Sequence, residues 1–403
     1  MLPTIAPSTS APRTVRLASV DAYRGLVMFL MLAEVLHTCD VSAALPASRF
    51  WRFLCFEQTH AAWVGCSLHD LIQPSFYFLV GVGLFLSMQR RMSSGQTPAS
   101  LAWHAIARSL TLILLGMLLV AVHPRQWVWN FVDTLTQIGL AYPFLFIIAL
   151  RPKRDWYIAL AAILFGYWLF FALSPPPSSD FDYDRVFVST EWLSRHGLHG
   201  FATHWQKNAN VAAAFDRWFI NLFPADVSHA GYTSGLTTLN FIPSIATMII
   251  GLLVGDFLKR ETATFQRLLT LAVSGVVLIG VGWGLGVLGI CPVVKAIWTP
   301  SWVLFSGGWC LLFTAALSAL VDIGGLSGLL FPLIVIGSNS VVAYGLSHLY
   351  PSFAFNSLRR LVGTAPFQIF GLPYEPFVYG CAVLTMYWVA LYVLYRQRVF
   401  VRI

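Results

Sequence analysis

The chain has 403 residues, of which 57% are hydrophobic and only 10% are charged, and its mean hydropathy is +0.71. Soluble domains carry about 25% charged residues, so the composition excludes an ordinary soluble protein and predicts a polytopic membrane protein. The net charge of +8 does not indicate nucleic-acid binding, because the basic residues lie in short clusters between apolar runs, where they set membrane orientation.

We predict an all-α fold, a bundle of about ten transmembrane helices. Each of ten apolar runs is near the twenty residues that cross about 30 Å of hydrocarbon. The predicted spans are residues 19–38, 70–89, 103–122, 132–150, 156–173, 240–258, 268–289, 299–320, 329–349 and 376–395. Residues 1–18 are expected to form a cytoplasmic segment, and residues 19–403 a single transmembrane domain.

The arginine and lysine residues predict the orientation of the bundle. With both termini in the cytoplasm, the inner loops collect most of the basic residues that flank the spans, which agrees with the positive-inside rule. This orientation places the loop around His60 outside, together with residues 174–239 between helices five and six. That insertion is too long for a structureless connection, and residues 208–223 have the apolar spacing of a surface helix. We expect it to cover the outer end.

The six cysteines show no CxxC or Cys/His spacing, so no metal site is predicted. Cys39, Cys55, Cys66 and Cys291 would all lie on the outer side, where a disulfide can form if the compartment is oxidising. Free buried thiols are the favoured interpretation, and a disulfide stays open.

Ionisable residues inside apolar helices are costly and therefore informative. Asp21 and Arg24 are three residues apart near the inner end of helix one, where they form either a local ion pair or a site for an anionic ligand. Glu34 and His37 have the same spacing near the outer end. They form either a pH-sensitive pair or a pair of side chains that extend to the membrane–water interface.

His60 is the best candidate for a general base or nucleophile, because imidazole titrates near neutral pH. From the residue type alone, a structural role is commoner for a single histidine. Asp70 could orient the imidazole or begin the second helix. Further polar residues are expected to face inward, and together they indicate a wet cavity, although each alone fits a helix-packing hydrogen bond: Asp133, Gln137, Asn240, Asn339 and Tyr344.

Seven motifs then occur in a specific order. They are SVDAYRG (19–25), HAAWVG (60–65), DLIQPSFYFLVG (70–81), GLTTLNFIPSIATMIIGLLVGDFL (235–258), CPVVKAIWTPSWVLFSGG (291–308), IGSNSVVAY (336–344) and YRQRVFVRI (395–403). This series closely resembles the transmembrane acyltransferases typified by lysosomal heparan-α-glucosaminide N-acetyltransferase and its bacterial relatives. The similarity extends from about residue 16 to the C-terminus.

The resemblance implies transfer of an acetyl group from cytoplasmic acetyl-CoA, used as a co-substrate without a metal, to an extracytoplasmic amino-sugar or glycan acceptor. It implies a multi-pass protein of the bacterial inner membrane, and a homodimer stays open. The active histidine of the HxxW motif corresponds to His60, accompanied by Trp63, and we add Asp70 and Asn339 to the catalytic set. We assign acetyl-CoA binding to Asp21, Arg24, Gln137, Asn240, Lys295, Ser301 and Tyr344.

Two departures from the family pattern concern the acceptor side. Family members commonly carry asparagine where this chain has Glu34-Val35, and a GVLQRI-like block where it has DTLTQI (133–138). These changes leave acyl transfer plausible and the identity of the acceptor open. N- versus O-acylation and the acyl length stay open as well.

Two other functions fit the same composition. A secondary transporter would also have about ten helices, with Arg24, Glu34, His37 and Asp133 as coupling residues. An inactive relative would bind CoA without turnover. Within the enzyme interpretation, His60 acts either as a general base in a ternary complex, which we favour, or as a transient acyl carrier.

Overall fold

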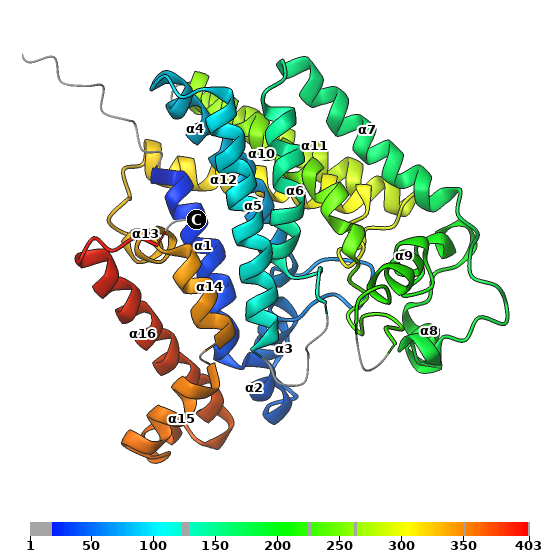
Figure 1. Cartoon of the computed structure of the whole chain (residues 1–403). Helices are drawn as coiled ribbons and strands as arrows, with labels where there is room; N and C mark the ends of the chain where they lie inside the picture. The colour runs from blue at the N-terminus through cyan, green and yellow to red at the C-terminus, as the bar shows by residue number, and fades with distance from the viewer. Residues whose placement is uncertain (1–17, 123–128, 225–227, 262–263, 350, 402–403) are drawn as a thin grey trace, which may run out of the picture.

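The computed structural model describes residues 18–122, 129–224, 228–261, 264–349 and 351–401 (Figure 1), so the predicted segment 1–18 lies almost wholly outside the described residues. The long helices are α1 (Ala18–Leu32), α4 (Ile72–Ser93), α5 (Pro98–Ala121), α6 (Thr134–Ala149), α7 (Lys153–Ala172), α10 (Phe241–Arg260), α11 (Phe265–Val287), α12 (Pro300–Leu317) and α16 (Glu375–Arg396). The shorter ones are α2 (Thr38–Ala44), α3 (Arg49–Gln58), α8 (Thr190–His196), α9 (Val211–Ile220), α13 (Phe331–Ser338), α14 (Ser340–Leu349) and α15 (Pro351–Val362).

The predicted all-α membrane bundle is confirmed. Eight helical segments of the described chain are long and apolar enough to cross a membrane. A ninth span is formed by α13 and α14 together if their 82° bend is counted within one span. The remaining predicted run, 132–150, coincides with α6, which is apolar but has only 16 residues. Each of the ten predicted runs therefore falls on helix, and two of them do not form a full, straight span.

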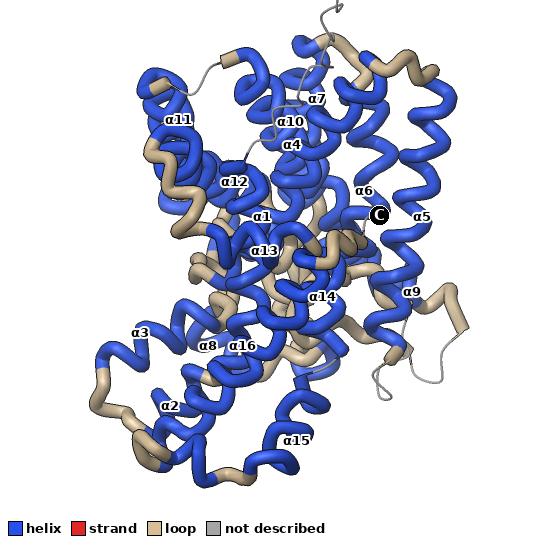
Figure 2. The backbone as a smooth tube through the Cα atoms, turned by 90° about the vertical axis from the view of Figure 1, so that its left-hand side faces the viewer, coloured by secondary structure: helices blue, strands red, loops and turns tan. Residues whose placement is uncertain are grey.

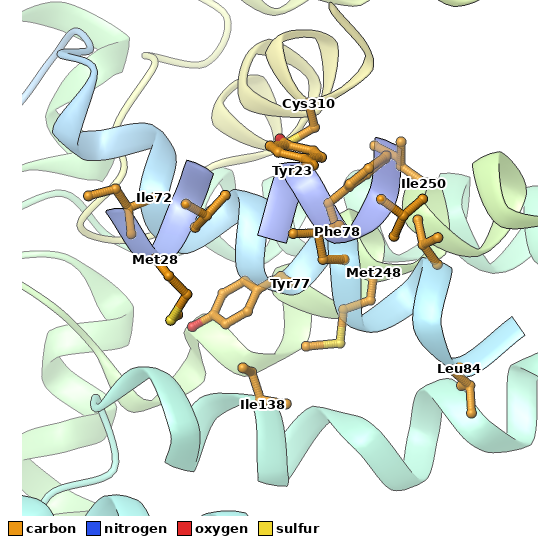
Figure 3. Close-up of a cluster of buried hydrophobic side chains, with 14 of the residues drawn as sticks. Tyr23, Met28, Ile72, Tyr77, Phe78, Leu84, Ile138, Met248, Ile250 and Cys310 are labelled. Atoms are coloured by element: carbon orange, nitrogen blue, oxygen red, sulfur yellow. The ribbon is translucent and has the colours of Figure 1, made fainter. Parts of the chain in front are cut away.

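The centre of the bundle is built where α1, α4, α10 and α12 meet (Figure 1). Tyr23 of α1, Phe78 of α4 and Met248 of α10 belong to one buried cluster there (Figure 3). Helices α4 and α10 approach to backbone contact, because a Cβ on Gly81 would meet the Met248 carbonyl and a Cβ on Gly251 would meet the Phe78 carbonyl. Small residues permit such close packing of membrane helices, so these glycines fix the helices that begin near the site.

The bend between α13 and α14 lies at Asn339. The Asn339 side-chain amide donates to the Val399 carbonyl oxygen (3.0 Å), and its Oδ1 accepts from the Val401 amide (3.0 Å). The side chain therefore supplies hydrogen-bond partners to two backbone groups of the C-terminal segment after α16. An asparagine that satisfies backbone groups in this way stabilises the irregular chain beside a broken helix.

The short helices α2, α3 and α15 gather at one end of the bundle, which is the predicted outer end (Figure 2). Cys39 of α2 and Cys55 of α3 form a disulfide there, so the expectation of free thiols was wrong for these two residues. The sequence could not show this pair, because only the antiparallel packing of α2 on α3 brings the two cysteines together. Cys66 and Cys291 are free thiols, as expected.

Removal of the disulfide by Cys39→Ser with Cys55→Ser is expected to lower the free energy of unfolding by about 3 kcal/mol, because the bond closes a short loop in the unfolded chain. Thermal unfolding in detergent measures the loss. Cys381→Ser, which removes a free thiol, is the matched control and should have little effect. Equal midpoints for the double variant and the control would contradict a native disulfide.

The segment 174–239 lies between α7 and α10 and contains α8, α9 and several short helical turns. The predicted helix in residues 208–223 is present as α9. This segment, which we call the cap, packs through Trp205 and Ala212 against Tyr167 and Phe171 of α7 and against Trp63. The cap is thus a folded element that shares a hydrophobic core with the loop carrying His60.

Asp216 of α9 is buried and holds the end of the cap just before α10, because both of its oxygens accept from the Thr238 amide (3.2 and 2.9 Å). Burial raises the pKa of Asp216 to about 6. In the unfolded chain an aspartate titrates near 3.9, so between about pH 4 and pH 6 the folded chain binds more protons. The free energy of unfolding must then fall as the pH rises through this window.

We expect this dependence to reach about 3 kcal/mol and to be absent in Asp216→Asn. The unfolding midpoint of the wild type, measured from pH 4 to pH 7, should decrease relative to that of the variant. If the difference in unfolding midpoint between the wild type and Asp216→Asn is independent of pH, or if the wild type gains stability as the pH rises, a buried neutral Asp216 is excluded.

Candidate active site

The loop that carries His60 is held in place from several sides. Ser67 Oγ donates to the Thr59 carbonyl oxygen (2.5 Å), and the Leu68 amide donates to Glu57 Oε2 (2.7 Å). The Gly65 amide also donates to the Val293 carbonyl oxygen (3.1 Å), which docks this loop on the segment before α12. His60 is therefore presented by an ordered loop, with its side chain 59% exposed.

His60, Asp70 and Lys295 form one cluster. His60 Nδ1 lies 2.8 Å from Asp70 Oδ1, and Lys295 Nζ lies 3.3 Å from the same oxygen and 3.2 Å from His60 Nδ1. The other carboxylate oxygen of Asp70 accepts from the Ala61 amide (3.0 Å) and the Ser67 amide (3.1 Å), and it lies 3.2 Å from the Ser67 hydroxyl oxygen. Asp70 is 1% exposed, so a buried carboxylate with many donors orients an exposed imidazole.

This network assigns the proton on the imidazole. An Asp70 carboxylate that already faces two amides, a hydroxyl and an ammonium is ionised, so its Oδ1 accepts from His60 Nδ1–H. In the neutral form of the ring, the lone pair is therefore on the other nitrogen, Nε2. Burial lowers the pKa of Lys295, while the Asp70 carboxylate opposes that shift. A neutral imidazole backed by a carboxylate is the arrangement of a general base.

Asn240 and Ser301 position Lys295 from behind. The Asn240 side-chain amide donates to the Ala296 carbonyl oxygen (2.8 Å), and Ser301 Oγ donates to the Pro292 carbonyl oxygen (2.6 Å). Thr299 caps the N-terminus of α12 and also donates to the Pro292 carbonyl oxygen (2.8 Å). These contacts hold residues 291–299 in place. The segment folds back over the start of α4, and this brings Lys295 beside His60.

Trp63 connects the His60 loop with the cap. Its indole is 3% exposed and donates to the Trp205 carbonyl oxygen (3.1 Å). Gly235 lies against the face of the ring with φ +79°, and a Cβ there would come within 2.6 Å of the indole. Lys207 packs over Trp192 beside it, 4.9 Å from the ring centroid. Trp63 therefore acts as an anchor for the cap.

The sequence of the chain is similar to those of known proteins. Residues 16–206 match the family model described as heparan-alpha-glucosaminide N-acetyltransferase, catalytic. The human heparan-alpha-glucosaminide N-acetyltransferase is 24% identical over 436 aligned residues, which cover 96% of this chain and 60% of the human protein. The mouse protein of the same name is 28% identical over 155 residues, or 37% of this chain and 21% of its own length.

The chain is similar in sequence to the heparan-α-glucosaminide N-acetyltransferases. The predicted resemblance is thereby confirmed, and the chain spans about 60% of the length of the human relative. The matched family region contains His60, Trp63 and Asp70. Lys295 and its supporting residues lie beyond that region, so the structure, rather than the family model, places Lys295 beside the histidine.

The resemblance also suggested Asp21, Arg24 and Gln137 as residues that bind acetyl-CoA. Their contacts are as follows. Arg24 lies 3.4 Å from Asp21 in the i, i+3 ion pair that their spacing allowed. Gln137 donates to the Thr238 carbonyl oxygen (3.0 Å), which joins α6 to the start of α10. Their part in acetyl-CoA binding stays a prediction.

Asn339 and Tyr344 belong to the broken helix pair. The amide of Asn339 is engaged by the C-terminal segment, as described above. Tyr344 donates to Asp133 Oδ2 (2.8 Å), and Asp133 caps α6 by accepting from the Leu135 amide (2.9 Å). The hydrogen-bond partners of both side chains are therefore structural, and the contacts described here do not join them to His60. A catalytic Asn339 and a CoA-binding Tyr344 stay predictions.

Glu34 and His69 form a second pair beside His60. His69 Nε2 lies 3.3 Å from Glu34 Oε1, and the rings of His69 and His60 are 4.6 Å apart between centroids. The expected Glu34–His37 pair was wrong, because His37 lies 3.3 Å from Asp40 instead. The HxxW motif and the helix start at Asp70 left His69 without an assigned role. Its position next to Asp70 was the only signal in the sequence.

The thiol of Cys66 lies near the same cluster but is unsuited to carry an acyl group. Burial raises the pKa of Cys66, and the Asp70 carboxylate raises it further. Because the thiolate is the nucleophilic form of cysteine, this environment suppresses its reactivity. The imidazole of His60 is the better candidate for the reacting group.

Proposed function

We propose that the chain is a membrane N-acetyltransferase that moves an acetyl group from cytoplasmic acetyl-CoA to the amino group of an extracytoplasmic glucosamine-type sugar. The observation that carries this proposal is the exposed imidazole of His60, held by the buried Asp70 and by Lys295. The relatives' name supports acetyl transfer to an amino sugar, and the apolar helices support a site at a membrane boundary.

In this proposal His60 Nε2 removes a proton from the acceptor nitrogen as it attacks the thioester carbonyl. Asp70 keeps the proton on Nδ1 and stabilises the imidazolium that forms. The imidazolium then returns the proton to the departing thiolate of CoA. Direct attack in a ternary complex is favoured, because it needs only a neutral imidazole and no labile acyl-imidazole beside water.

The disulfide Cys39–Cys55 supports an extracytoplasmic position for this end of the bundle, since disulfides persist in oxidising compartments. The basic residues at the opposite ends of the helices, such as Arg90, Arg91 and Lys259, agree with the positive-inside rule. A pantetheine arm that enters from the cytoplasm must then reach toward the His60 end. For a bacterial chain, this orientation corresponds to the inner membrane.

The purified wild type, incubated with acetyl-CoA, should release free CoA only when glucosamine is added, and N-acetylglucosamine should form in equal amount. Thiol titration and mass spectrometry measure the two products. Binding of acetyl-CoA without product would support an inactive relative. Uptake of an unmodified solute into proteoliposomes without acetyl transfer would support a transporter. Either result would overturn the proposal.

A further inference from the structure

The balance of protons in the proposed reaction demands a second proton acceptor. An aliphatic amine enters mainly as R–NH₃⁺ near neutral pH, and the product is R–NH–COCH₃. The N–C bond forms, the C–S bond breaks, and the nitrogen loses two protons. One proton is taken by His60 and ends on the sulfur of CoA. The other must leave to solvent before the nitrogen has a lone pair for attack.

The structure contains a second histidine–carboxylate pair at the right place. Glu34 Oε1 is 3.3 Å from His69 Nε2, and the His69 ring packs 4.6 Å from the His60 ring between centroids. Glu34 comes from the short helical turn Ala33–Leu36 after α1 and His69 from the turn before α4, so two separate elements bring this pair beside the first. The proposed proton transfer by His60 does not use this pair.

This second pair opens onto a cavity, whereas Asp70 is sealed from solvent. The cavity has a volume of about 240 Å³ and is lined by Glu34, His37, Asp40 and His69, among others. The Glu34 side chain is 55% exposed, and that of His69 is 12% exposed. Water in the cavity can therefore reach the carboxylate, while the imidazole stays close to His60.

We propose that Glu34 and His69 form a proton outlet that takes the first proton from the acceptor ammonium and passes it to water in this cavity. His69 Nε2–H donates toward Glu34, so the other ring nitrogen, Nδ1, can accept a proton. Asp70 orients His60 in the same way, but through Nδ1 of that ring. The inference rests on the proposed function, because it applies to an amine acceptor. It also gives a role to Glu34.

Charged groups from several elements face the pair. His60, Asp70 and Lys295 act on His69, and His60, Lys295 and His348 of α14 act on Glu34. The cavity adds His37 and Asp40 of the α2 region. Burial of the ring disfavours a protonated His69 most, His60 and Lys295 disfavour it further, and Asp70 favours it, so the proton passes on to Glu34 rather than staying on the ring.

The test compares two acceptors in the full-length protein. Glu34→Gln is expected to lower kcat/KM for glucosamine about 10²-fold near neutral pH, and the loss should shrink as the pH rises and free amine accumulates. An aminooxy sugar, whose nitrogen is already unprotonated at neutral pH, should be acetylated almost as fast by the variant as by the wild type. Glu34→Asp should restore part of the activity toward glucosamine.

Glu191→Gln in α8, which removes an exposed carboxylate of the cap, is the matched control and should leave both pH profiles unchanged. Equal losses of Glu34→Gln with both acceptors at every pH, or no loss with glucosamine, would overturn the proton outlet alone. Absence of transfer by the wild type to either acceptor would overturn the proposed function, and the outlet with it.

Discussion

Replacement of His60 by alanine is expected to lower the rate of acetyl transfer about 10³-fold, the usual contribution of a positioned general base. The side chain is 59% exposed, so its removal should cost little stability and leave acetyl-CoA affinity unchanged. Release of CoA in the presence of glucosamine measures the rate, and equilibrium binding of acetyl-CoA measures the affinity.

His199→Ala provides the control, since His199 is an exposed histidine of the cap and should be dispensable. Wild-type rates in His60→Ala would exclude His60 as the base. Mass spectrometry after incubation with acetyl-CoA alone should find no acetyl group on His60. A stable acetylated His60 that later transfers its acetyl group would replace the ternary-complex mechanism by a covalent one.

Asp70→Asn is expected to reduce transfer by about 10³-fold or more, because an amide no longer enforces the proton on His60 Nδ1 and no longer stabilises the imidazolium. The change also leaves the ammonium of Lys295, whose side chain is 14% exposed, without its carboxylate. Breaking a buried ion pair from one side costs about 3–5 kcal/mol, so thermal unfolding should begin at a lower temperature.

A second substitution separates the two effects of Asp70→Asn. Asp70→Asn combined with Lys295→Met removes both charges and should regain most of the lost stability, because uncharged replacements of a buried pair are often neutral. Acetyl transfer should stay low in the double variant. Recovery of both stability and activity would show that Asp70 serves only to compensate Lys295.

The arrangement of the helices could be predicted well because hydropathy alone marks apolar runs of membrane-spanning length. The predicted run 268–289 coincides with α11, and 376–395 lies within α16. The break at Asn339 could not be predicted, since the run 329–349 is apolar on both sides of it. The contact of the Asn339 side chain with the C-terminal segment, which is distant in the sequence, stabilises the bend.

The site could be predicted in part. The HxxW motif and the nearby Asp70 indicated the imidazole and its carboxylate, because the two residues are close in the sequence. Lys295 is 235 residues from His60, and the resemblance marked it without saying where it lies. Its position depends on the folding of residues 291–299 onto the His60 loop, which no local pattern encodes.

Pairs of ionisable residues were the least predictable feature. The i, i+3 rule identified the Asp21–Arg24 pair, because both residues lie on regular helix. The same rule failed for Glu34 and His37, since α1 ends at Leu32 and His37 has a left-handed backbone with φ +49°. The tighter turn that follows α1 turns the two side chains toward different partners.

The most direct test encloses acetyl-CoA labelled in the acetyl group inside sealed proteoliposomes and supplies glucosamine only outside. We predict labelled N-acetylglucosamine outside and free CoA inside for the wild type, with neither product for His60→Ala. Labelled acetyl-CoA or unmodified glucosamine crossing the membrane, or product formation that persists without His60, would contradict transfer of an acetyl group across the bilayer by this histidine.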